Sequence, residues 1–231
     1  MGLALSWRVT DQGEGPDQSR PRFGRVDKEG SLFNLSFGIV ALGANLPLTQ
    51  RQDPVLTLRA ALSILHKQPG ISIASISRIW RTPAVPAGSG PDYANAAAII
   101  GTTLDPDQLL ARLHQIEADH GRDRSGGRWS ARVLDLDLIA HGDLILPDPG
   151  HLRRWMDLPF DRQRQETPDR LILPHPRLQD RAFVLAPLAE IAPAWRHPLT
   201  GRSVIQMLDD LGPDALQAMA PVTLAEKAAF G

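Results

Sequence analysis

The 231-residue sequence contains no cysteine, which excludes disulfide bonds, thiolate metal sites and cysteine nucleophiles. This composition suits a reducing compartment, and we expect a cytoplasmic protein. No apolar run approaches the roughly 20 residues that a membrane-spanning helix requires, so we expect no membrane partner. The formal net charge is only −1, so the chain lacks a general positive field that would attract nucleic acid. Any positively charged site must therefore be local.

Sustained apolar periodicity is missing from residues 1–34, which are polar and carry Gly, Pro and mixed charges. We expect a flexible tail there. Residues 35–231 have the length and composition of one folded domain. A polar stretch at about 147–170 reads as an insertion into this domain.

Four stretches of the domain have the composition of β-strands, at residues 35–43, 71–80, 93–104 and 132–142. In the second stretch the alternation of side chains slips by one residue at Ala74 and Ser75. That slip predicts either a β-bulge or a strand that is covered on both sides.

Two amphipathic helices are predicted between these strands, and each begins at an Asp-Pro pair. Asp53 and Asp105 are the expected N-caps, because aspartate accepts backbone N–H groups and proline suits the first helical turn. A short helix is expected near residues 203–211. The order β-α-β-β-α-β predicts an α+β protein with a ferredoxin-like sandwich, in which helices pack on an antiparallel sheet.

Two aspartates, Asp135 and Asp137, interrupt the apolar run of the last predicted strand. Alternate residues of a strand share one face, so these carboxylates point the same way while the leucines between them point the other way. Carboxylates this close repel each other unless a cation compensates them. The candidates are arginine side chains or a metal ion, and Mg²⁺ often takes only one or two carboxylates together with phosphates and water.

An arginine-rich loop precedes that strand and carries Arg122, Arg124, Arg128 and Arg132. Glycines at 121, 126 and 127 favour mobility. The planar guanidinium group binds phosphate with two hydrogen bonds, so the loop could clamp a polyphosphate. A solvated turn is the alternative interpretation.

Two further clusters could bind a substrate. His175, Arg177 and Arg181 lie close together in sequence, where a histidine beside two arginines could donate to a phosphate. Trp80 and the only tyrosine, Tyr93, could form a flat pocket with Asn95, or they could simply occupy a strand end and a turn.

Six stretches in the right order resemble the 6-hydroxymethyl-7,8-dihydropterin pyrophosphokinases of folate biosynthesis: LGANL, WRTPAVP, PDYANAA, IEADHGRDR, RWSARVLDLDL and LPHPRLQDRAFVLAPLAEIAP. They span residues 42–193. The resemblance implies a ferredoxin-like catalytic domain that transfers the pyrophosphoryl group of ATP to the pterin hydroxymethyl oxygen and releases AMP. ATP would be the co-substrate, with two Mg²⁺ ions held by Asp135 and Asp137.

The resemblance also implies roles for individual residues. Catalytic roles fall to Arg122, Arg132, Asp135 and Asp137. The implied nucleotide contacts are Glu117, Arg122, Arg124, Arg132, Arg170, Ile172, His175 and Arg181. The implied pterin contacts are Thr82, Pro83, Val85, Tyr93, Asn95, Trp129 and Phe183, with Trp129 and Phe183 stacking on the two faces of the ring.

The sequence departs from the family pattern at Ala44, at Ala84 and in the long insertion. Two other functions remain open. A different two-metal nucleotidyl transferase would also use paired aspartates. An RNA-binding module of the same architecture would stack bases on strand aromatics, but aromatic residues make up only 5% here. We expect a monomer that acts on small molecules.

Overall fold

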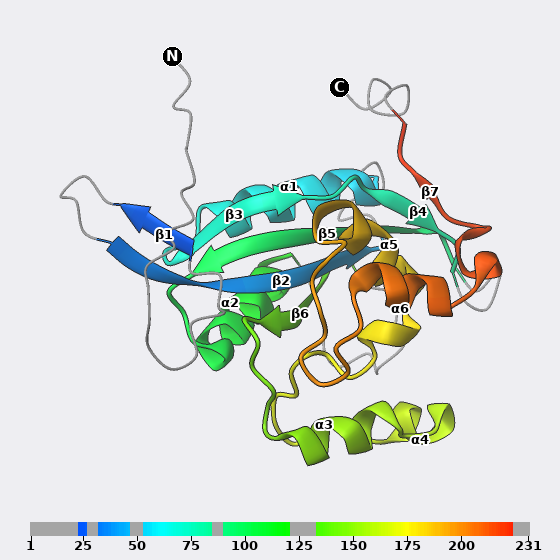
Figure 1. The fold of residues 1–231 in the computed structure, drawn as a ribbon. Coiled ribbons are helices and arrows are strands. Elements are labelled where there is room, and N and C mark those ends of the chain that lie inside the picture. Colours follow the sequence, from blue (N-terminus) through cyan, green and yellow to red (C-terminus); the bar gives the residue numbers. More distant parts are fainter. Residues whose placement is uncertain (1–22, 27–31, 47–52, 85–89, 121–132, 224–231) are drawn as a thin grey trace.

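The computed structural model describes residues 23–26, 32–46, 53–84, 90–120 and 133–223. One antiparallel sheet runs through this part of the chain (Figure 1), with β6 paired to β2, β2 to β5, and β5 to both β3 and β4. Its strands are β1 (Phe23–Val26), β2 (Leu32–Ala44), β3 (Ile71–Ile76), β4 (Trp80–Thr82), β5 (Tyr93–Thr102), β6 (Asp135–His141) and β7 (Ala220–Pro221).

The strand order β6-β2-β5-β3, with α1 (Pro54–His66) between β2 and β3 and α2 (Pro106–Asp119) between β5 and β6, confirms the predicted ferredoxin-like arrangement. The remaining helices are α3 (Pro149–Met156), α4 (Phe160–Gln165), α5 (Ala182–Ile191), α6 (Val204–Asp210) and the 3₁₀ turns η2 (Leu178–Asp180) and η3 (Pro213–Leu216). No helix within the described ranges is long and apolar enough to cross a membrane.

Both Asp-Pro pairs start helices as predicted. The Asp53 side chain accepts the backbone N–H of Val55 at 2.7 Å. The Asp105 side chain accepts the backbone N–H of Gln108, whose side chain in turn accepts the Asp105 N–H and completes a capping box. Each such cap stabilises its helix by about 1 kcal/mol.

The two faces of the sheet carry separate cores. The face covered by α1 and α2 buries alternate residues such as Val40 and Leu42 of β2 against Leu58 and Leu113 of the helices. The opposite face, which we call the α5 face, packs against α5 and α6. There β2 contributes Ile39 and Ala41, and β5 contributes Ala97 and Ile99. The sheet is therefore covered on both sides over most of its length.

The first and second predicted strands differ most from the structure. β2 begins at Leu32 rather than Leu35, and β1 pairs with it inside the stretch predicted as a tail. The second predicted strand is divided into β3 and β4, both paired with β5. The predicted slip is confirmed, because the register shifts between Ile73 and Ser75. The division into tail, domain and insertion stays a prediction.

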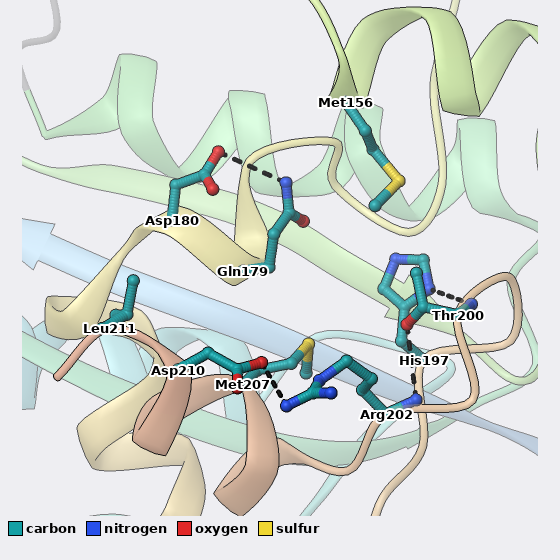
Figure 2. A pocket seen from close by; sticks show the side chains of 9 residues that line it. All are labelled: Met156, Gln179, Asp180, His197, Thr200, Arg202, Met207, Asp210 and Leu211. Atoms are coloured by element: carbon teal, nitrogen blue, oxygen red, sulfur yellow. Dashed lines mark hydrogen bonds and ion pairs between the residues drawn. The ribbon is translucent and has the colours of Figure 1, made fainter.

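The insertion contains α3 and α4, which lie apart from the sheet in Figure 1. Its two ends meet where Leu146 and Leu173 exchange backbone hydrogen bonds of 2.9 and 3.1 Å. Met156 of α3 lines a cavity of about 260 Å³ together with residues of η2, α6 and the turn at 197–202 (Figure 2). The insertion and the C-terminal part of the chain thus share the wall of one cavity.

His197, a fully buried residue, also lines this cavity. Its Nδ1 accepts the backbone N–H groups of Leu199 (3.2 Å) and Thr200 (3.4 Å). Burial penalises the charged imidazolium and lowers the pKa of His197 to about 4. Between pH 6.5 and about 4 the unfolded chain therefore binds a proton that the folded chain does not. The contribution of His197 to the free energy of unfolding therefore falls as the pH falls through this window.

We predict that His197→Asn reduces this pH dependence, because the Asn amide oxygen can accept the same backbone N–H groups but does not titrate. Denaturant unfolding between pH 7 and pH 4.5 measures the free energy of unfolding of both proteins. The stability advantage of the wild type over the variant should shrink steadily as the pH falls. An advantage that stays constant over this range would show that His197 is not buried in its neutral form.

Candidate functional site

The α5 face changes from apolar to polar towards one end of the sheet. Along β6 the residues on this face run from Ile139 to Asp137 and Asp135, and along β5 they run from Ile99 through Ala97 to Asn95. The apolar ends are buried in the core beneath α5. The polar ends of neighbouring strands therefore gather at one edge of that core.

Three residues stand side by side across these strand ends. Gly43 of β2 pairs with Asn95 of β5 on one side and with Asp135 of β6 on the other. Residues opposite one another on neighbouring strands project from the same face. Asn95 is 5% exposed and donates from Nδ2 to Thr82 Oγ1 at 2.7 Å, so its amide is fixed in orientation. Its neighbour Thr82 is also buried.

Asp135 and Asp137 are half-buried, whereas Leu134, Leu136 and Leu138 are buried in the core on the opposite face. This confirms the predicted alternation along the strand. Arg181 Nη1 lies 3.4 Å from Asp137 Oδ2, so one cation of the protein already compensates part of this charge.

No cluster of three or more His, Cys, Asp or Glu with metal-site geometry occurs in the described part of the chain. A pair of carboxylates on one strand face suits Mg²⁺, which takes phosphate oxygens and water as its other ligands. The donor set of Asp135 and Asp137 therefore fits the implied metal.

Glu117 of α2 is only 1% exposed, and its Oε1 accepts the backbone N–H of Leu136 at 2.8 Å. Leu136 lies between the two aspartates, so this hydrogen bond fixes the part of β6 that carries them. The structure thus gives Glu117 a positioning role, and direct nucleotide contact by Glu117 stays a prediction.

His175 follows the second end of the insertion and is fixed by two backbone contacts. Its N–H donates to Ile139 O at 2.8 Å, and its Nδ1 accepts the Arg177 N–H at 3.1 Å. Burial, then the positive charges of Arg181 and Arg177, lower the pKa of His175 to about 3, against an opposing effect of Asp135. His175 is therefore neutral near pH 7, with its proton on Nε2, where it can donate.

Arg181 and Phe183 lie at the start of α5. The Arg181 guanidinium lies 5.6 Å from the centre of the Phe183 ring, and Phe183 is 40% exposed. An exposed ring at the edge of a polar site can stack on a planar ligand. Tyr93, half-buried, lies at the first position of β5, two residues before Asn95.

The structure describes three more of the predicted site residues. Pro83 is exposed just after β4, Ile172 is buried, and Arg170 is exposed and paired with its neighbour Asp169 at 3.3 Å. Five predicted residues lie outside the described residues: Val85, Arg122, Arg124, Trp129 and Arg132.

Trp80, a candidate for the flat pocket, donates its indole N–H to Glu190 Oε1 at 3.1 Å. Glu190 also accepts from Arg78, through the backbone N–H and the guanidinium. These bonds tie the end of α5 to the strand edge beside Thr82. Sequence patterns gave no sign of this, because the two segments are 110 residues apart.

The sequence interpretation also missed Gly43 as a site residue, although it belongs to the quoted stretch LGANL, in which Asn45 is buried. A polar residue two positions beyond Gly43, at the end of a buried strand, was the available signal. The cavity of Figure 2 contains none of the predicted site residues.

Comparisons of sequence agree with these observations. A family model described as 7,8-dihydro-6-hydroxymethylpterin-pyrophosphokinase (HPPK) matches residues 39–193. The chain is 36% identical over 184 residues to a 2-amino-4-hydroxy-6-hydroxymethyldihydropteridine pyrophosphokinase of Synechocystis sp., covering 79% of this chain and 80% of that protein. It is 34% identical over 169 residues to the protein of the same name from Pseudomonas aeruginosa, covering 73% and 88%.

Among solved structures, the chain resembles HPPK-DHPS from Plasmodium falciparum with a TM-score of 0.59 and 12% sequence identity. The match covers 83% of this chain and 46% of that one, so the chain spans less than half of the solved protein. At this identity the match supports the fold and nothing more.

We predict that Glu117→Ala lowers the free energy of unfolding by about 1–3 kcal/mol, because the buried Leu136 N–H loses its carboxylate acceptor. Glu117→Gln is the matched control, since its amide oxygen can still accept that N–H, and it should be closer to the wild type. Urea unfolding at pH 7 compares the three proteins. Equal losses in the two variants would show that charge, rather than this hydrogen bond, is what Glu117 supplies.

Proposed function

The chain belongs to the 7,8-dihydro-6-hydroxymethylpterin-pyrophosphokinase family, and from this premise we propose how its own residues perform the reaction. It is an enzyme that transfers pyrophosphate from ATP to the hydroxymethyl group of 6-hydroxymethyl-7,8-dihydropterin and releases AMP. The hydroxymethyl oxygen forms a bond to the β-phosphorus while the bond from that phosphorus to the AMP oxygen breaks.

The phosphate end of the site lies at Asp135 and Asp137 in this proposal. These carboxylates would hold two Mg²⁺ ions, whose other ligands would be phosphate oxygens and water. When bound, the metal neutralises phosphate charge and polarises the phosphorus that is attacked. The geometry that supports this assignment is the shared, half-buried face of the two acids on β6.

The protein contributes further compensation of phosphate charge. Arg181, already within 3.4 Å of Asp137, is placed to contact a phosphate beside that acid. His175 would donate a neutral hydrogen bond from Nε2. It is unsuited to be the general base, because its Nδ1 already accepts the Arg177 N–H. Pyrophosphoryl transfer depends on position and charge neutralisation more than on a protein nucleophile.

Five further residues retain their implied nucleotide roles as proposals. The loop arginines Arg122, Arg124 and Arg132 would grip the triphosphate and help to exclude water when ATP is bound. Arg170 and Ile172 would contact the nucleotide at the end of the insertion.

The pterin end of the site lies at Thr82 and Asn95. The buried Asn95 amide is fixed by its bond to Thr82 and can form hydrogen bonds with the polar edge of a pterin ring. Phe183, with its exposed ring, would stack on one face of the pterin. Pro83, Val85, Tyr93 and Trp129 would complete this pocket, with Trp129 on the opposite face of the ring.

The single observation that carries this assignment is that Gly43 pairs with Asn95 on one neighbouring strand and with Asp135 on the other. The amide proposed to bind the pterin and the carboxylate proposed to bind the metal thus lie on either side of one glycine. We also propose that the enzyme is a cytoplasmic monomer that binds no nucleic acid. The net charge of −1 supports the last point.

Product analysis tests the reaction directly. Incubation with ATP, Mg²⁺ and hydroxymethyldihydropterin should yield AMP and the pyrophosphorylated pterin. A nucleotidyl transferase would instead release pyrophosphate and place AMP on the acceptor, and a simple kinase would release ADP. Either pattern would contradict the proposed transfer.

We predict that Asp135→Asn and Asp137→Asn each lower turnover at least about a hundredfold, because each removes a charge that the transition state needs. Asp143→Asn is the matched control, since Asp143 is exposed in the turn after β6 and should behave like the wild type. Steady-state rates are measured alongside unfolding midpoints. Near-normal turnover in both site variants with the fold intact would remove the metal assignment.

A further inference from the structure

Gly43 lies inside strand β2, where glycine is an unfavourable residue. A glycine inside a strand weakens it, because the unfolded chain gains entropy and no side chain packs. The backbone does not require glycine there either. Positive φ angles occur at Gly70, Gly142, Gly201 and Gly212 among the described glycines, but not at Gly43. The remaining reason for a glycine is the space that a side chain would fill.

A side chain at position 43 would project towards the proposed site and not into the core. A methyl group on Gly43 would lie 3.3 Å from Asn95 Oδ1 and 4.0 Å from Asp135 Cβ. The glycines Gly38 and Gly101 differ, because methyl groups there would meet core side chains, at 2.9 Å from Ile100 and 3.0 Å from Leu35. Core packing explains those two glycines, and it does not explain Gly43.

The side chains on the α5 face of β2 also become smaller towards the site. They run from Ile39 through Ala41 to Gly43, while β5 and β6 beside them place polar side chains at the same level. Neighbouring strands lie about 4.8 Å apart, so the backbones of Asn95 and Asp135 lie about 10 Å apart with Gly43 between them. Because Gly43 carries no side chain, it leaves a gap between these two residues on the α5 face.

We propose that Gly43 gives the hydroxymethyl group of the pterin, which accepts the pyrophosphate, access to the phosphates of ATP. The hydroxymethyl arm of the pterin passes over Gly43, from the ring held at Asn95 to the phosphates held at Asp135. This inference rests on the proposed function, because it places the two reacting groups on either side of one residue. A side chain at position 43 would fill this gap and crowd Asn95 Oδ1, the atom that faces it, while the Asn95 Nδ2 bond to Thr82 stays in place.

The test is the series Gly43→Ala and Gly43→Ser, compared with wild type. The KM for the pterin should rise at least tenfold, or kcat/KM for the pterin should fall by that factor, with a larger effect for Ser. The Kd for an Mg²⁺-bound, non-hydrolysable ATP analogue should change less than threefold. The unfolding midpoint should stay equal or rise, because alanine favours a strand more than glycine does.

Gly101→Ala is the matched control, since it makes the same change on β5 about 20 Å along the strand from Asn95. It should lower the unfolding midpoint, because its methyl group meets Leu35, and leave the pterin KM of the folded enzyme unchanged.

Three results would overturn the inference. Unchanged pterin kinetics in Gly43→Ala would show that the gap is not used by the acceptor. A parallel loss of ATP-analogue affinity, or a lowered unfolding midpoint, would show that Gly43 is structural. Wild-type enzyme that forms no AMP would overturn the proposed function and the role of Gly43 with it, whereas an active wild type with an unaffected variant overturns the role of Gly43 alone.

Discussion

Two carboxylates on one strand face must have their charge compensated, and this requirement organises the site. Asp135 and Asp137 cannot turn into the core, because the alternation of β6 commits Leu134, Leu136 and Leu138 to that side. Arg181 compensates part of the charge on Asp137. We propose that a divalent cation and its phosphate ligands complete this compensation, so that the requirement to neutralise two neighbouring acids makes this strand face the binding site for Mg²⁺ and ATP.

The rest of the fold holds this charged edge in register. Glu117 reaches from α2 to the backbone between the two aspartates. His175 is bonded to the backbone of the same strand at Ile139. Glu190 fixes α5, and with it the segment that begins at Arg181, against β4. Each of these contacts comes from a different part of the chain, so the geometry of the proposed site depends on the packing of the sheet with its helices.

Much of this could be predicted from the sequence, because the signals were local. The Asp-Pro pairs mark helix starts whose caps depend on residues two and three positions away. The bulge at β3 and the shared face of Asp135 and Asp137 follow from counting alternate residues. The ferredoxin-like order follows from the sequence of elements.

The parts that could not be predicted depend on contacts between distant segments. Glu117 accepts a hydrogen bond from Leu136, which lies 19 residues later in the sequence, and this contact forms only because α2 packs on β6. The bond of Trp80 to Glu190 spans 110 residues. The position of Gly43 between Asn95 and Asp135 is set by the register of three strands, which no local pattern encodes.

A crystal structure with Mg²⁺, a non-hydrolysable ATP analogue and the pterin would test the central claim most directly. We expect metal density on Asp135 and Asp137, the triphosphate beside Arg181, and the pterin at Asn95 with its arm over Gly43. A triphosphate bound elsewhere, with no cation in contact with either acid, would contradict the electrostatic basis of the site.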